Sequence, residues 1–151
     1  RIHLFGVGAS GLLAMDFLYK SSRIGIPATY HADAHTNLAT ASLLGPEDIV
    51  IAISYSGETR ETVLAAKAAK ERGAKVIAIT QANRNTLSRM ADYPLFVPGE
   101  EKELRVGAMT SRTSGLLILD LLYLGIAKHD PQRTEENLRQ TRDLIRAFQE
   151  E

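Results

Sequence analysis

Two short segments carry the residue types that could bind a ligand in this sequence. Residues 6–11 (GVGASG) have the spacing G-x-G-x-x-G, and residues 54–59 (SYSGET) place three hydroxyls around a glycine. Hydroxyl donors next to the exposed N–H groups of a helix start can bind a phosphate without any cation. A helix cap needs only one hydroxyl, so the second segment favours a phosphate site over simple capping.

The first segment has two interpretations when it is taken alone. After a strand and before a helix, G-x-G-x-x-G is the fingerprint of a dinucleotide-binding loop. Asp33 lies roughly where such a site places the acidic residue that holds a ribose hydroxyl. A dinucleotide pyrophosphate is held by that first loop alone, however, whereas this chain adds a second loop rich in hydroxyls. Because Ser10 brings one more hydroxyl, the two loops together favour a pocket for a small polyhydroxy phosphate.

Apolar segments of strand length alternate with helical segments along the chain. Residues 48–54 (DIVIAIS) and 75–80 (KVIAIT) are apolar on both faces, as buried parallel strands are. We expect strands at residues 2–5, 27–30, 48–54, 75–80 and 95–97, and helices at residues 10–22, 36–44, 58–72, 86–90, 107–128 and from 131 onward. This order predicts an α/β fold, a three-layer αβα sandwich around a five-stranded parallel sheet. Ligands bind such sheets at the carboxyl ends of the strands, where both loops lie.

Composition limits the functions open to the chain. Its 18 basic residues are balanced by 18 acidic ones, which argues against binding nucleic acid by itself. It has no cysteine, so it can form no disulfide and no thiolate metal site. The longest apolar run, residues 115–127, is interrupted by Asp120 and is too short to span a bilayer. We therefore expect one soluble, cytoplasmic domain over residues 1–151, and the start at Arg1, directly in a strand, suggests a piece of a longer protein.

The two loops and their spacing resemble the sugar isomerase (SIS) domain, over essentially the whole chain. The first loop contributes Gly8, Ala9 and Ser10, and the second contributes the pattern S-x-S-G-x-T at residues 54–59. Residues 103–112 (ELRVGAMTSR) narrow the resemblance to the ligand-binding half of RpiR-type transcriptional regulators.

This resemblance implies a flavodoxin-like sheet that binds a phosphorylated sugar and assembles as a homodimer or homotetramer. Residues 111–113 (SRT) and the serine loop are similar to regulators of N-acetylmuramic acid 6-phosphate metabolism, which adds amino-sugar phosphates to the expected ligands. The implied site residues are Ser54, Ser56, Gly57 and Thr59 for the phosphate, Ser10 with the backbone of Gly8 and Ala9 nearby, and His35 and Glu103 near the sugar.

RpiR-type regulators begin with a helix-turn-helix domain, and nothing in this sequence resembles one. The resemblance therefore implies the effector-binding domain of a regulator that contacts DNA only through a domain outside this chain. The apolar helix expected at residues 107–128 would transmit ligand binding to a subunit interface. We expect no cofactor and no catalytic residue. We also expect no metal, because no further ligands accompany His31, Asp33 and His35.

The alternative is an aldose–ketose phosphosugar isomerase of the same domain family. Such an enzyme needs a general base, for which Glu103 is the candidate, and often a histidine that opens the sugar ring, for which His35 is the candidate. Glu103 could equally be a solvated carboxylate beside Glu100 and Glu101, and His35 could cap a helix or lie exposed. We favour the sensor over the enzyme.

Overall fold

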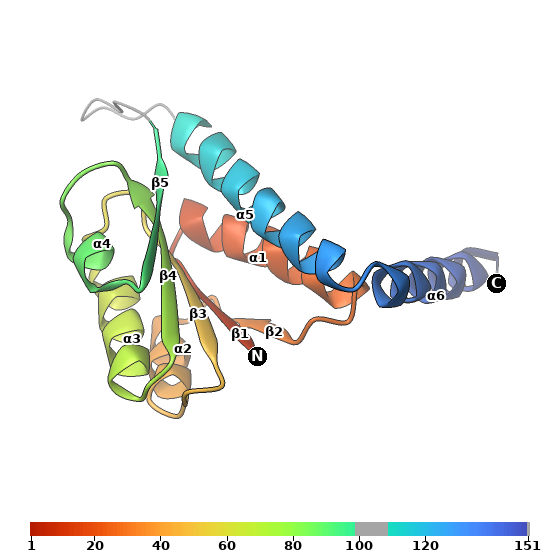
Figure 1. Ribbon diagram of the computed structural model, residues 1–151, viewed down its shortest axis with the longest axis horizontal. Helices are drawn as coiled ribbons and strands as arrows, with labels where there is room; N and C mark the ends of the chain where they lie inside the picture. The colour runs from red at the N-terminus through yellow and green to blue at the C-terminus, as the bar shows by residue number, and fades with distance from the viewer. Residues whose placement is uncertain (99–108, 151) are drawn as a thin grey trace.

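Five parallel strands form one sheet in the computed structural model, which describes residues 1–98 and 109–150 (Figure 1). The strand order is β2-β1-β3-β4-β5. The strands are β1 Ile2–Phe5, β2 Ala28–Tyr30, β3 Ile49–Ile53, β4 Lys75–Gln81 and β5 Tyr93–Val97, and the helices are α1 Ala9–Arg23, α2 Ala34–Ala41, α3 Arg60–Glu71, α4 Thr86–Met90, α5 Met109–His129 and α6 Pro131–Glu150. The α/β fold predicted from the sequence is confirmed, and the element ends differ by a few residues.

The helices cover the sheet in two layers. Side chains along β3 alternate between them, as the pleat of a strand requires. Val50 and Ala52 join the core formed with α2, α3 and α4, whereas Ile51 and Ile53 join the core formed with α1 and α5. This arrangement explains why the segment is apolar at every position. On the α3 side many of the buried side chains are alanines, so α3 can lie close to the sheet.

The loops that follow β1 and β3 leave the carboxyl edge of the sheet toward opposite faces. These strands are neighbours, but α1 lies on one face and α3 on the other (Figure 1). Chains that leave adjacent strands in opposite directions create a crevice, and this switch point is where open α/β sheets bind ligands. The topology therefore brings the GVGASG and SYSGET loops to the expected place.

The α5 helix is buried along one side only. Its Leu119 is 1% exposed, whereas Leu117 and Leu121 are each 60% exposed. The sequence, apolar on almost every side, predicted a helix buried between the sheet and a second surface such as another subunit; the described part packs one face on α1 and the sheet and leaves the other open. The first two residues of the predicted helix lie outside the described residues. No described helix is long and apolar enough to cross a membrane.

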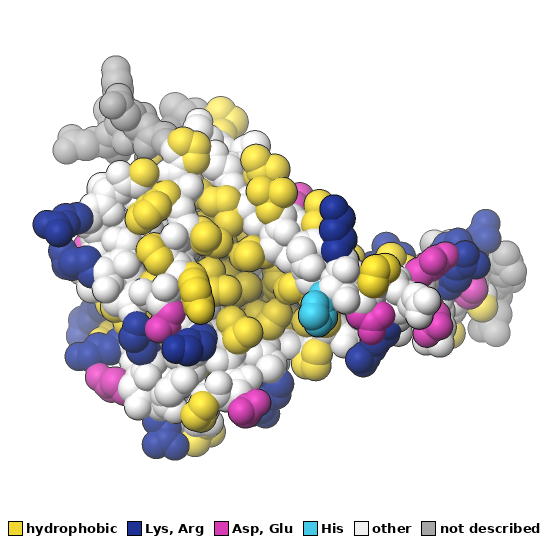
Figure 2. Space-filling model, viewed as in Figure 1, with side chains coloured by type: hydrophobic (Ala, Val, Ile, Leu, Met, Phe, Trp, Pro, Cys, Tyr) yellow, Lys and Arg dark blue, Asp and Glu magenta, His cyan; other side chains and the backbone are white. Residues whose placement is uncertain are grey.

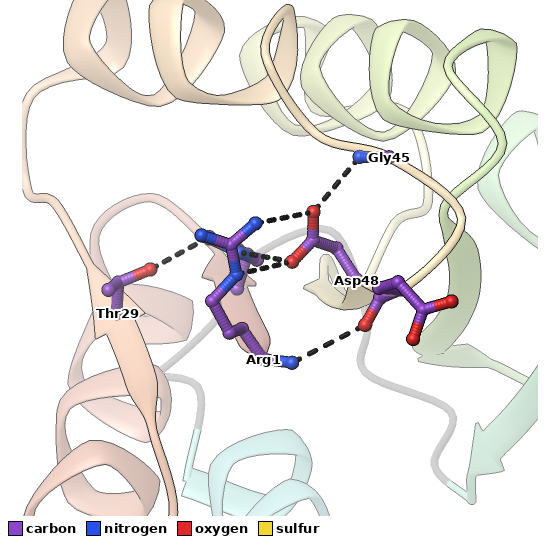
Figure 3. Close-up of polar contacts among 6 residues, drawn as sticks. Arg1, Thr29, Gly45 and Asp48 are labelled. Carbon is purple, nitrogen blue, oxygen red and sulfur yellow. Dashed lines mark hydrogen bonds and ion pairs between the residues drawn. The ribbon is translucent and has the colours of Figure 1, made fainter.

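A buried carboxylate ties the amino ends of the strands together (Figure 3). Asp48, 1% exposed, accepts hydrogen bonds from the Arg1 Nε at 2.9 Å and from the Gly45 N–H at 2.9 Å. His3 on β1 lies with Nε2 3.4 Å from Asp48 Oδ1 and with Nδ1 2.8 Å from the Thr29 hydroxyl. This cluster joins β1, β2 and the start of β3 at the edge of the sheet opposite the two loops.

Candidate functional site

The three hydroxyls of the SYSGET loop lie together where β3 ends. The Ser54 Oγ is 2.9 Å from the Thr59 Oγ1 and 3.5 Å from the Ser56 Oγ. The Gly57 N–H donates to the Ser54 hydroxyl at 3.1 Å, and the Glu58 N–H donates to the Ser56 hydroxyl at 3.2 Å. Ser54 is buried, while Ser56 and Thr59 are partly exposed. The loop therefore holds a small array of hydroxyls at the carboxyl end of β3.

The start of α3 has no side-chain cap. Thr59 is the N-cap residue, but its side chain makes no capping hydrogen bond; its hydroxyl faces Ser54 instead. The helix was expected from residue 58 and begins at Arg60, because Thr59 has an extended backbone. First-turn N–H groups without a capping side chain make the positive end of a helix available to an anion. The geometry thus disfavours simple capping and fits the phosphate interpretation.

The loop between β4 and α4 packs against the SYSGET loop and supports its conformation. Gly57 has a φ of 67°, and its carbonyl accepts the Leu87 N–H at 3.0 Å. Asn85, 2% exposed, packs against Gly57 so closely that a Cβ on this glycine would overlap the amide. The Asn85 Nδ2 donates to the Thr80 hydroxyl at 3.0 Å, and that hydroxyl donates to the Tyr55 carbonyl at 3.1 Å.

The contact between Asn85 and Gly57 was not predicted from the sequence. A local signal did exist for Asn85, because residues 85–88 (NTLS) form a capping box at the start of α4. Its role beneath Gly57 depends on the pairing of β3 with β4, which no local pattern reveals. Glu58 also joins the SYSGET loop to the start of α4. Its carboxylate accepts the Thr86 N–H at 2.7 Å, and the hydrogen bonds with Thr86 lower the pKa of Glu58.

The GVGASG loop supplies a tight turn and one hydroxyl, that of Ser10, at the start of α1. Gly8 has a φ of 58° and is the N-cap of α1, again without a side-chain cap. Gly11 is buried directly beneath Tyr30, whose hydroxyl a Cβ at this position would overlap. The last glycine of the pattern is therefore required by packing against β2. Ala9 is exposed and Ser10 is partly exposed.

The acidic residue expected of a dinucleotide site is already occupied. Asp33 caps α2, and its Oδ1 accepts both the Thr36 N–H and the Thr36 hydroxyl at 2.8 Å. The hydrogen bonds from Thr36 lower the pKa of Asp33. Helix α2 consequently starts at Ala34, two residues before the predicted start. Capping of α2 therefore accounts for an aspartate at position 33, and no ribose hydroxyl is needed to explain it.

The remaining predicted site residues are not joined to the hydroxyl cluster by any described contact. His35 is exposed on the first turn of α2, and it does not cap that helix, since Asp33 does. Glu103 lies outside the described residues. Within residues 1–98 and 109–150, no three His, Asp or Glu side chains gather as a metal ion would need.

The two loops share one hollow at the carboxyl edge of the sheet. Ala9 and Ser10 of the first loop and Tyr55 of the second line it, together with Ser111 and Arg112 on the first turn of α5. Its cavity volume is about 60 Å³. A larger hollow of about 360 Å³ lies near the junction of α5 and α6 and the start of β2, away from both loops.

An open parallel sheet with an uncapped, hydroxyl-rich loop at its switch point has the features of an anion-binding α/β domain. Comparison with known proteins makes this class specific. The SIS domain family model matches residues 1–125, so the chain belongs to the SIS domain family, as the resemblance of its two loops predicted.

Curated relatives of this chain are named HTH-type transcriptional regulators. The uncharacterised HTH-type transcriptional regulator TTE0211 of Caldanaerobacter subterraneus subsp. tengcongensis is 39% identical over 145 residues, which cover 96% of this chain and 51% of the relative. The chain thus spans about half the length of that curated relative. Among solved structures, the Vibrio vulnificus NanR protein complexed with ManNAc-6P matches with a TM-score of 0.90 and 29% identity, over 97% of this chain and 55% of that one. The sugar isomerase domain of an RpiR transcription factor from Sphaerobacter thermophilus matches with a TM-score of 0.80 and 28% identity, over 94% and 78%.

Proposed function

We propose that this chain is the phosphosugar-sensing domain of a bacterial RpiR-family transcriptional regulator of sugar or amino-sugar metabolism. The observation that carries the proposal is the cluster of Ser54, Ser56 and Thr59 hydroxyls at the uncapped start of α3. It has the donors that a phosphate needs and no fixed cation. The homologous HTH-type regulator and the NanR protein solved with ManNAc-6P support the same role.

In this proposal each loop has a separate task. Ser54, Ser56 and Thr59, with the backbone at Gly57, hold the phosphate. Ser10 and the backbone of Gly8 and Ala9 approach the same ligand from the first loop, which shares a hollow with Tyr55. His35 and Glu103 are assigned to the sugar by resemblance alone.

Replacing Ser56 by alanine should abolish the stabilisation that a bound phosphosugar gives. A ligand at a hundred times its dissociation constant stabilises a protein by about 2.7 kcal/mol, which a thermal-shift screen of phosphosugars detects. The Ser56 hydroxyl accepts one backbone N–H at 3.2 Å, so the ligand-free protein should lose only about 1 kcal/mol.

The matched control for this screen is Ser42→Ala. Its hydroxyl donates to the Ala39 carbonyl at the exposed end of α2, away from both loops, so the ligand-induced shift should remain. A full shift in the Ser56 variant would contradict the phosphate site.

We assign binding rather than turnover to this domain, because its relatives are regulators. The isomerase alternative makes a distinct prediction. Turnover of an aldose or ketose phosphate by this chain, lost on Glu103→Gln, would replace the sensor by an enzyme with Glu103 as general base.

We also propose that the chain forms a homodimer or homotetramer. Apolar side chains gather on the face shown in Figure 2, over the sheet and α5; those on the open side of α5 include Leu117, Leu121 and Leu124. Helix α6 extends away from the body (Figure 1) with Phe148 80% exposed. Uncovered apolar faces of this kind mark subunit contacts.

Ligand binding should change how the subunits are arranged. A ligand shifts such an equilibrium only if it prefers one arrangement, and α5 connects the two sites because its first turn lines the hollow. Small-angle scattering with and without a tight-binding phosphosugar tests this expectation. Identical scattering curves would exclude α5 as the transmitter.

In this proposal DNA is bound by a helix-turn-helix domain outside this chain, and the regulator acts in the cytoplasm.

A further inference from the structure

The hollow between the two loops has an apolar floor that phosphate binding does not require. Ile53, Ile79 and Val97, from the ends of β3, β4 and β5, line it, and each is at most 3% exposed. Its polar residues are Ser10, Tyr55 and, on the first turn of α5, Ser111 and Arg112. The hollow adjoins the hydroxyl array because Tyr55, between Ser54 and Ser56, contributes to its wall.

A close contact between two helices shapes the wall of this hollow. Gly115 of α5 and Leu13 of α1 both line it, and a Cβ on Gly115 would lie 2.5 Å from the Leu13 Cδ2. The glycine therefore allows α5 to approach α1 over the ends of the strands. Without this approach the strand ends would face open solvent and would form no enclosed apolar space.

The size and lining of the hollow select a chemical group. A sugar hydroxyl placed against its floor would lose its hydrogen bonds to water, and the apolar side chains there offer no replacement. A cavity of 150 Å³ binds benzene, so a volume of about 60 Å³ suits a group of a few heavy atoms. An acetyl group has this size, with an apolar methyl and one polar end.

We propose, on the basis of the phosphosugar binding inferred above, that this hollow binds the N-acyl group of an N-acylated amino-sugar phosphate. The acyl methyl contacts the strand ends at Ile53, Ile79 and Val97. The amide faces the polar rim, where Ser111 and Arg112 lie. Recognition of the acyl group and recognition of the phosphate thus belong to neighbouring surfaces, and the ligand class follows from both.

Isothermal titration with matched sugar phosphates tests the inference. The probes are glucosamine 6-phosphate and mannosamine 6-phosphate, each with and without an N-acetyl group. In at least one pair the acetylated member should bind about tenfold tighter or more, the effect of one small apolar group in a fitted pocket. Equal or weaker binding of the acetylated members would overturn the inference and leave the proposed function standing. Binding of none of the four would also overturn the inference, whereas the proposed function is tested separately by the phosphosugar screen with Ser56→Ala.

Variants of Val97 change the hollow without touching the hydroxyl loop. Val97→Ile adds one methylene and should remove most of the preference for the acetylated sugar. Val97→Ala enlarges the space and should allow the N-propionyl derivative to bind about as tightly as the N-acetyl one. The control Val63→Ile adds the same methylene to the core on the other face of the sheet and should change neither preference; unchanged preferences in both Val97 variants would refute the assignment.

Discussion

Replacing Gly57 by alanine should abolish phosphosugar binding and lower the free energy of unfolding by about 2–6 kcal/mol. Two effects combine. The φ of 67° is a conformation that costs a non-glycine residue about 1–3 kcal/mol, and the new Cβ would overlap the Asn85 amide, an overpacking cost of about 1–3 kcal/mol. Relief of either strain moves the loop that holds the hydroxyls. Urea unfolding and phosphosugar titration measure the two losses.

The control for this substitution is Gly45→Ala. Space is open around Gly45, and its backbone is not in the left-handed region. Its alanine variant should unfold within about 1 kcal/mol of the wild type and bind with unchanged affinity. If the Gly57 variant binds phosphosugar as tightly as the wild type, the hydroxyl array is not the phosphate site.

Gly57 also shows what could be predicted from the sequence. The SYSGET loop was predictable because an apolar strand, a hydroxyl-rich turn and an alanine-rich helix follow one another within 25 residues. The order places the loop at the carboxyl edge of a parallel sheet before any contact is known. The conformation of the loop was not predictable, because it depends on Asn85 and Thr80, which reach it through the pairing of β3 with β4.

The GVGASG loop shows the opposite case, in which a local pattern matches a ligand motif although its residues have structural roles. Its glycines match a dinucleotide fingerprint, but Gly11 is needed for contact with Tyr30 of the neighbouring strand. Asp33 matches the same fingerprint and caps α2. A glycine or an aspartate at these positions can serve ligand binding or local structure, and only its contacts in the folded chain show which role it has. The second loop corrected the interpretation because three hydroxyls cannot all be helix caps.

The Asp48 cluster was not predicted either, because its members lie far apart in the sequence. The cluster is distant from the GVGASG and SYSGET loops, so a substitution in it should change stability without changing ligand binding. Asp48→Ala should lower the free energy of unfolding by about 2–4 kcal/mol, since it removes the acceptor of the part-buried Gly45 N–H and the partner of the buried His3. Phosphosugar affinity of the folded variant should not change. Asp143→Ala, which removes an exposed carboxylate from α6, is the control and should cost less than about 0.5 kcal/mol.

The same cluster should make stability depend on pH in two windows. Burial lowers the pKa of His3 more than Asp48 raises it, so the net pKa is below the ordinary 6.5. Burial raises the pKa of Asp48, but the Gly45 N–H, Arg1 and His3 lower it more, so the net pKa is below 3.8. Folding thus favours the deprotonated form of both groups.

Stability from His3 is therefore complete above about pH 6.5 and is lost as the pH falls below that value; stability from Asp48 is lost below about pH 3.8. Urea unfolding of the wild type and of His3→Gln from pH 8 to pH 3 measures both windows. The variant should lack the first loss and keep the second. A wild type that gains stability relative to His3→Gln between pH 7 and pH 5 would contradict the buried, neutral His3, because it would mean that Asp48 holds the imidazole in its charged form.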